Sequence, residues 1–274
     1  MRKEALLICT LLALATQTKA ESYTIKVKPY PSSGKSFAVK VIDRLEASQT
    51  LEEKGKPAQT VKSEAVRTDE YNQSTLTVEG GKLATFQRVY TASTVTSGDK
   101  TEKTIFDGKK IQFTFDKKQC KHDLKDEKLS PDDNKKLTDA HTDGLAVLVG
   151  LLPDKPINEG DEWPLTGKQI VSGLVTVPVD PERSRGKGKL VKVTKRDGVP
   201  IGTIEIEIDV ETVAEALGKG KGKFVIKAET PIDGSATQAK MSIKGSLTIE
   251  SEEKGTRTKV VAGGELSFEI SEEK

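Results

Sequence analysis

Residues that could do chemistry are few, and histidine is the scarcest of them, with only His122 and His141 in 274 residues. Cys120-Lys121-His122 brings two potential metal ligands together, but no second pair follows at a spacing used by zinc sites. Asp132-Asp133-Asn134 lacks the glycine and the terminal glutamate of a calcium loop. We therefore expect no metal and no cofactor, and we interpret Cys120 and His122 as a lone thiol and an exposed histidine in a loop.

Nucleophilic catalysis has no recognisable signature. The chain contains no Gly-x-Ser-x-Gly elbow, and the Ser-x-x-Lys spacings at Ser32–Lys35 and Ser184–Lys187 lie in loop-like stretches without partner motifs. Carboxylates are so abundant that the sequence gives no means of choosing an acid pair. We expect no catalytic residues, and hence no enzyme, with a hydrolase of unidentified site as the third of three alternatives.

Four residues are weak candidates for binding: Trp163, His141, Leu145 and Leu148. Trp163 is the only tryptophan, and it is either a packing anchor or a platform on which a ligand stacks. His141 falls on the apolar face of a predicted helix, as a core or interface histidine or as a pH-sensitive contact. Leu145 and Leu148 lie on the same face and would cover a ligand held beneath the helix.

This helix is the element that would position three of the four candidates. Ser130 is a good N-cap, Pro131 suits the first helical position, and apolar residues recur at spacings of three and four as far as Leu152. Pro153 and Pro156 end it. Its second half is apolar nearly all round, so we expect it to be buried against a sheet.

Short runs of alternating apolar and polar residues flank the helix on both sides. Period-two alternation with β-branched and aromatic residues predicts strands, and because one face of each run is polar we expect antiparallel sheet with one wet face. The apolar members of the clearest runs are Phe37, Val39 and Val41; Leu76 and Val78; Ile111, Phe113 and Phe115; Ile204, Ile206, Ile208 and Val210; Phe224 and Ile226; Leu247 and Ile249; and Leu266, Phe268 and Ile270. Turn chemistry is supplied by Gly80-Gly81, Asp107-Gly108, Asp197-Gly198 and Asp233-Gly234.

The fold class that follows is mainly β: a curved antiparallel sheet, or an open barrel or half-barrel, with one central α-helix packed on its apolar face. Two similar β lobes joined through the helix are the alternative architecture. We expect residues 1–20 to be a signal peptide and residues 21–274 a single domain. Within that domain we expect N-terminal strands over 22–115, a loop and helix over 116–153, a linker over 154–185 and C-terminal strands over 186–271.

The N-terminus has the form of a secretory signal: a charged start, an apolar run over 5–15, and small residues at Thr18 and Ala20. A run of this length rises roughly 16 Å as a helix, about half of a bilayer core, so we do not expect a membrane-spanning anchor. Cleavage near Ala20, or less favourably after Ala15, would leave a soluble periplasmic or extracellular protein. A buried N-terminal helix is the alternative.

The distribution of charged residues supports the division into a signal peptide and a mature chain. The chain has 44 Lys+Arg and 42 Asp+Glu, and residues 1–20 hold three of the cations (Arg2, Lys3, Lys19) and one anion (Glu4). Subtracting them (44 − 3 and 42 − 1) leaves 41 of each sign. A mature chain without net charge is not suited to nucleic acid, which is bound through counterion release.

Seven cations and no anion occur within residues 183–196, at Arg183, Arg185, Lys187, Lys189, Lys192, Lys195 and Arg196. This segment could bind an anionic headgroup or polysaccharide. We favour a solvated strand face that lies beside an acidic neighbour, for which the stripe Glu205, Glu207, Asp209 and Glu211 is the obvious candidate.

The segment Pro153-x-Lys155-Pro156-Ile157-x-x-Gly160-Asp161-x-Trp163 resembles one in uncharacterised bacterial exported β-rich proteins, where it follows a central helix. That resemblance implies no activity. Strands that flank a helix resemble, more distantly, the periplasmic half-barrels with a helical lid that carry lipids or lipoproteins. This second resemblance implies an apolar concave binding face covered by the helix.

Three functions follow in order of preference. The first is a non-catalytic exported envelope protein that binds or carries an apolar, lipid-like ligand under the helix, and the second is a structural or protein-interaction β module. For these two functions, the expected partner of the protein is an apolar ligand or another envelope protein. The hydrolase is third.

Removal of the signal peptide predicts a measurable shift in isoelectric point. The full sequence has a pI of about 8.3, whereas the mature chain, with balanced charge, should focus closer to neutral pH. Isoelectric focusing of the exported protein, with its intact mass measured in parallel, tests this. An exported form that still focuses near the precursor value would contradict the cleavage.

Overall fold

The computed structural model describes residues 21–30, 32–79, 82–116, 119–124, 144–173, 179–214, 218–253 and 255–272. Its N-terminal strands are β1 (Ser22–Tyr23), β2 (Ser36–Glu53), β3 (Gln59–Glu79), β4 (Lys82–Ser97), β5 (Lys100–Lys103), β6 (Lys110–Asp116) and β7 (Gln119–Asp123). Two short strands, β8 (Ile157–Asn158) and β9 (Glu162–Leu165), lie between the helices α2 (Gly144–Gly150) and α3 (Gly167–Gly173). The C-terminal strands are β10 (Arg185–Arg196), β11 (Val199–Ala214), β12 (Gly218–Pro231), β13 (Ala239–Glu253) and β14 (Thr256–Glu272).

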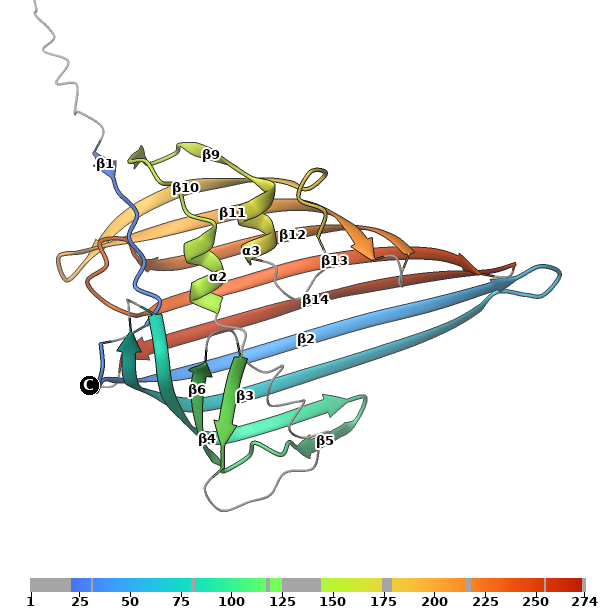
Figure 1. Cartoon of the computed structure of the whole chain (residues 1–274), viewed down its shortest axis with the longest axis horizontal. Coiled ribbons are helices and arrows are strands. Elements are labelled where there is room, and N and C mark those ends of the chain that lie inside the picture. Colours follow the sequence, from blue (N-terminus) through green and yellow to red (C-terminus); the bar gives the residue numbers. More distant parts are fainter. Residues whose placement is uncertain are drawn as a thin grey trace, which may run out of the picture.

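One large antiparallel sheet contains almost all of these strands (Figure 1). Its twelve strands follow the order β7-β6-β4-β3-β2-β14-β13-β12-β11-β10-β9, and β5 pairs with β4 beside this path. β2 pairs with β14 from Phe37–Glu272 to Glu53–Thr256, so the first long strand joins the last one. β1 and β8 form a separate two-stranded sheet. The predicted mainly β class, with a curved antiparallel sheet, is confirmed.

Alternation in the sequence locates the strands well. Every run expected to be a strand lies inside one, although the strands extend much further, to 18 residues in β2 and 21 in β3. The expected turn at Asp197-Gly198 is a two-residue hairpin loop between β10 and β11, in which both residues have positive φ (52° and 83°). Paired positive φ values are typical of a type I′ turn, whose twist matches that of the strands.

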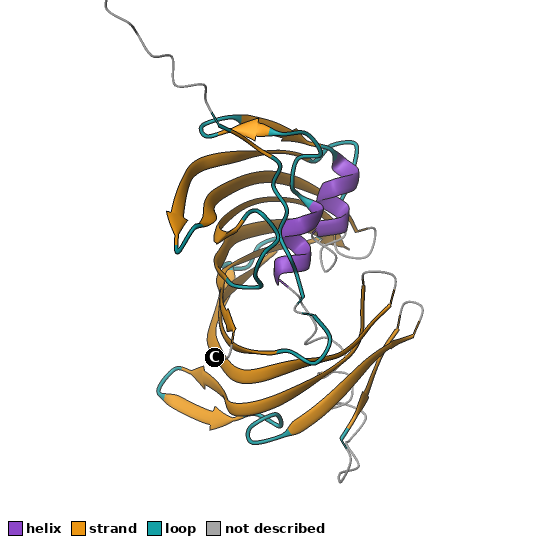
Figure 2. Cartoon of the chain, turned by 90° about the vertical axis from the view of Figure 1, so that its left-hand side faces the viewer, coloured by secondary structure: helices purple, strands orange, loops and turns teal. Residues whose placement is uncertain are grey.

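Two short helices lie on one side of the sheet, inside its curve (Figure 2). α2 is the apolar end of the predicted helix, whose expected start at Ser130 lies outside the described residues. α3 was not expected, because residues 154–185 read as a linker. Its start is a capping box: the Gln169 amide N–H donates to Thr166 Oγ1 (3.3 Å), and the Thr166 N–H donates to Gln169 Oε1 (2.9 Å). Neither described helix is long and apolar enough to cross a bilayer.

Neighbouring strands form ion pairs on the polar face of the sheet. As predicted, the cationic β10 lies beside the acidic stripe of β11, with Lys187 opposite Glu207 and Lys189 opposite Glu205. The closest ion pairs of the acidic stripe in β11, however, are formed with its other neighbouring strand, β12, as in Lys227–Glu205 (2.9 Å). Lys187 and Lys189 instead approach Glu162 of β9 (3.5 and 3.7 Å). These charges sit on an exposed face, where each pair contributes about 0 to 1 kcal/mol.

Trp163 connects the helices to the sheet. It is 6% exposed, and its indole Nε1–H donates to the backbone oxygen of Leu151, just after α2 (2.9 Å). Its cross-strand partner in β10 is Gly188, and the indole ring lies directly over that glycine. A Cβ at position 188 would stand 2.1 Å from the ring atom Cε2, so only glycine fits there without moving the ring.

Replacing Gly188 with Ala should destabilise the protein by about 1 to 3 kcal/mol, the usual cost of overpacking a core site. The displaced ring would also weaken its hydrogen bond to Leu151. Chemical denaturation followed by fluorescence of this single tryptophan measures both effects. Gly150→Ala is the matched control, because nothing lies within 4 Å of a Cβ at that position. Equal stability of the two variants would contradict the role of the ring contact.

Candidate functional site

Three of the four residues predicted to bind a ligand are parts of the packed interior. Leu145 and Leu148 of α2 are 1% and 0% exposed, and they belong to the same core cluster as Trp163. His141 lies outside the described residues. The structure therefore brings Trp163, Leu145 and Leu148 together, but as buried side chains that no ligand reaches without movement of the helix.

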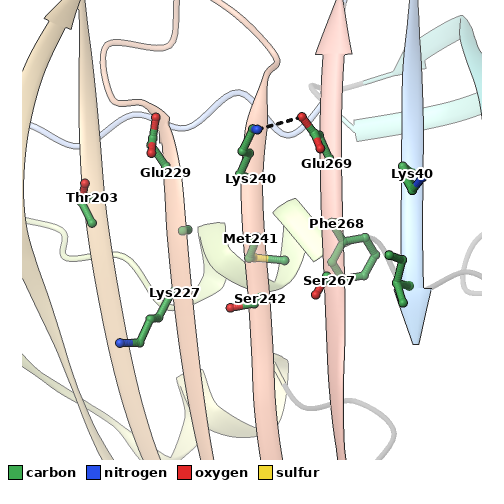
Figure 3. Close-up of a pocket in the computed structure, with 12 residues that line it drawn as sticks. Lys40, Thr203, Lys227, Glu229, Lys240, Met241, Ser242, Ser267, Phe268 and Glu269 are labelled. Carbon is green, nitrogen blue, oxygen red and sulfur yellow. Dashed lines mark ion pairs between the residues drawn. The ribbon is translucent and has the colours of Figure 1, made fainter. Parts of the chain in front are cut away.

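Two hollows are found on the opposite, polar face of the sheet. The larger, of about 460 Å³, spans β11, β12, β13, β14 and β2 (Figure 3). Its polar lining residues are Lys40, Thr203, Lys227, Glu229, Lys240, Ser242, Ser267 and Glu269. The second, of about 440 Å³, lies further along β2, β3 and β14.

The cations of the larger hollow are already engaged. Lys240 pairs with Glu269 (3.0 Å, dashed in Figure 3), Lys40 with Glu70 (2.6 Å) and Lys227 with Glu205 (2.9 Å). A charged ligand would have to displace these partners, so we do not regard this hollow as the functional site.

On the concave face, apolar side chains continue beyond the area that is fully buried. Antiparallel register places side chains of successive strands in rows across this face. One row starts at Ile206 of β11 and passes through Ile226, Ile243 and Leu266 to Asp43 of β2. The two residues at the β11 end are 0% exposed, whereas the three at the β2 end are half-buried.

The next row shows the same gradient more strongly. It begins at Ile208, which is 0% exposed, and ends at Leu45, which is 57% exposed. Between them lie Phe224, Gly245 and Gly264. The Phe224 ring covers Gly245, and the Leu45 side chain lies 3.4 Å from the place where a Cβ of Gly264 would stand. We call this uncovered part of the concave face the apolar strip; it consists of Leu45, Phe224, Ile243, Leu247, Ala262 and Leu266.

Asp43 is the one carboxylate within these rows. It lies next to Leu266, and among the described residues its carboxylate has no hydrogen bond or ion pair. Its cross-strand partner in β3, Arg67, forms an ion pair with another carboxylate: Arg67 Nη2 binds Asp69 Oδ2 at 2.8 Å, and the guanidinium stacks on Phe106. The buried Arg67 Nε has no hydrogen-bond partner among the described residues. Asp69 in turn accepts a hydrogen bond from the Ser93 hydroxyl.

Burial raises the pKa of the Asp43 carboxyl above its usual range, and the Asp69 charge adds to this effect. Arg67 lowers the pKa without cancelling the rise. A charged group that folding makes harder to ionise costs stability, and such groups cluster at functional sites.

Sequence reasoning missed Asp43 and Leu45, although a signal for them exists. The alternation Phe37, Val39, Val41 continues without a bulge to positions 43 and 45. The predicted run stops at Val41, and Asp43 is the first charged residue in an inward position of β2. The described parts of the chain hold no group of three or more His, Cys, Asp or Glu side chains placed to bind a metal.

The raised pKa predicts that Asp43→Asn stabilises the protein at neutral pH. The native state holds the Asp43 proton more tightly than the unfolded state, so stability falls as pH rises from about 3.9 through the raised pKa. Asn removes this penalty. Thermal unfolding from acidic to neutral pH should show a gain in Tm that disappears at the acidic end.

Asp107→Asn provides a control of opposite sign. The Lys103 ammonium and the Ser93 amide N–H lower the pKa of Asp107. Its stabilising contribution is present above the unfolded pKa and is lost as pH falls, so Asn should lower the Tm at neutral pH. If both variants shift the Tm in the same direction, the environment assigned to Asp43 is wrong.

Comparisons with known proteins add little to this geometry. No protein-family model matches the chain, and no curated protein does. Among solved structures, the chain is similar to a LolA superfamily protein from Nitrosomonas europaea, at 10% sequence identity over 86% of each chain and a TM-score of 0.14. A similarity this weak carries no argument about fold or ligand, and none of these comparisons supports the resemblance based on residues 153–163.

Proposed function

We propose that this protein is a non-catalytic binding protein that holds an apolar, lipid-like ligand on the apolar strip. The observation that carries the proposal is the gradient of exposure along the concave face, from 0% at Ile208 to 57% at Leu45 within one row of side chains. An apolar surface that continues past its cover is typical of an interaction site.

The site differs from the one expected under the helix. Leu145 and Leu148 are closed off, so a ligand would lie beside α2 and α3, on strands β12, β13, β14 and β2. The helices then form one wall of the site instead of its lid. Covering Leu45 alone would contribute a large part of the 1.5 to 3 kcal/mol that full burial of a leucine provides.

A protein-interaction module is the second candidate, because part of β3 has an unpaired backbone edge among the described strands. β3 pairs with β4 only from Val66 onward, so its first residues, from Gln59 to Ala65, pair with β2 alone. Val61 in this edge is 69% exposed. Lys62 and Glu64 lie in the same edge, however, and charged residues discourage strand addition.

We further propose that the protein acts outside the cytoplasm after removal of residues 1–20. The form and charge of that segment support this proposal. An envelope location would also give the strip access to membrane-derived ligands.

Binding of a neutral apolar dye such as N-phenylnaphthylamine tests the strip directly. The dye should gain fluorescence with the intact protein, and Leu45→Gln should weaken its affinity about tenfold, equivalent to 1.4 kcal/mol of lost apolar contact. Leu45 is exposed, so the variant should keep its Tm.

Val89→Gln is the matched control. Val89 is a 39% exposed aliphatic residue on the polar face of β4, and its replacement should leave dye binding unchanged. Absence of dye binding, or equal loss in both variants, would refute the binding function; native mass spectrometry that finds only dimers and no bound ligand would favour the interaction module.

A further inference from the structure

We infer that the ligand of the apolar strip is a single-chain amphiphile with a protonated amine at its polar end, and that the Asp43 carboxylate binds this amine. The inference rests on the proposed function and specifies the chemistry of its ligand. It starts from Asp43, the inward carboxylate that lies next to Leu266 at the edge of the strip.

Among the described residues, the Asp43 carboxylate accepts no hydrogen bond and forms no ion pair. It is half-buried beside Leu266, and no described residue donates a hydrogen bond to it. Partial burial without such a donor penalises the charged form of the carboxylate. A ligand that supplies a charged donor would satisfy the carboxylate at the moment when the apolar chain excludes water from it.

The surrounding charges favour a cation over an anion. Arg67 could attract an anionic headgroup, but its charge is compensated by Asp69 at 2.8 Å. Asp69 is 8% exposed and is held by Ser93 as well, which keeps this ion pair in place. The elements next to Asp43 therefore present one compensated pair from β3 and only Leu266 from β14, and the uncompensated charge is negative.

The strip has room for a long chain that starts at this carboxylate. Beyond the row of Asp43, the inward positions of β2 and β14 are Leu45 with Gly264, Ala47 with Ala262, and Gln49 with Val260. Each row adds two residues along the strand, so three rows extend about 20 Å. The residues at 264, 262 and 47 are small, and the rows that contain them continue to Phe224 of β12 and Leu247 of β13.

Competition against the bound dye tests the inference, with three probes of equal chain length: a saturated long-chain primary amine, the corresponding alcohol and the corresponding carboxylate. All are used below their micelle concentrations, at neutral pH, where the amine is protonated. A charged hydrogen bond in this setting should let the amine displace the dye at about tenfold lower concentration than the alcohol, with the carboxylate weakest.

Asp43→Asn should abolish the preference for the amine while dye and alcohol bind as before. This variant is expected to be at least as stable as the native protein, so loss of fold does not confuse the result. Glu46→Gln, which removes the same charge from the polar face of β2, should retain the preference.

The outcomes distinguish failure of the headgroup assignment from failure of the proposed function. Equal displacement by all three probes, preference for the carboxylate, or an amine preference that survives Asp43→Asn would overturn the headgroup assignment and leave the apolar site standing. Failure of the dye and of every probe to bind would overturn the proposed function itself.

Discussion

Two helices of seven residues can cover only part of an apolar face that spans a twelve-stranded sheet. Each is about 10 Å long, and neighbouring strands are about 4.8 Å apart, so the pair shields a few strands at most. Among the described residues the shielded end is that of β10 and β11, where α3 contacts β10 and the inward isoleucines are completely buried. The incomplete burial of the apolar strip, on the neighbouring central strands β12, β13, β14 and β2, follows from this shortage of cover.

Much of the fold could be predicted from local pattern, because the alternation of apolar and polar residues marks the strands. The C-terminal strands and the Asp197-Gly198 hairpin are examples in which side-chain period and turn chemistry agree. α3 could have been found as well, since Thr166-x-x-Gln169 is a capping box, but the glycines at both ends of this short segment made it read as a linker. The site could not be predicted in the same way. Which inward residues stay exposed depends on where the helices lie, and that is decided by contacts between distant segments such as Trp163 and Gly188.

The charged residues have a different role from the one that their number suggests. On the polar face, cations and anions alternate between adjacent strands, so they compensate each other locally as well as in total. Such a surface favours water and opposes sheet-to-sheet association without attracting a particular polyion. Two carboxylates face the other way: Asp69 forms an ion pair with Arg67, whereas Asp43 has no ion pair among the described residues.

The pairing of β2 with β14 also constrains how the chain reaches its native state. Glu53 meets Thr256 and Phe37 meets Glu272, so the central ladder of the sheet closes loops of about 200 residues. Contacts of such large sequence separation form slowly, because the entropy of loop closure is lost before any strand pairing compensates for it. The N-terminal and C-terminal hairpins can form early and independently, but the surface that joins them exists only after β14 has been made and has found β2. The apolar strip lies across this last seam, so it is among the final features of the molecule to assemble.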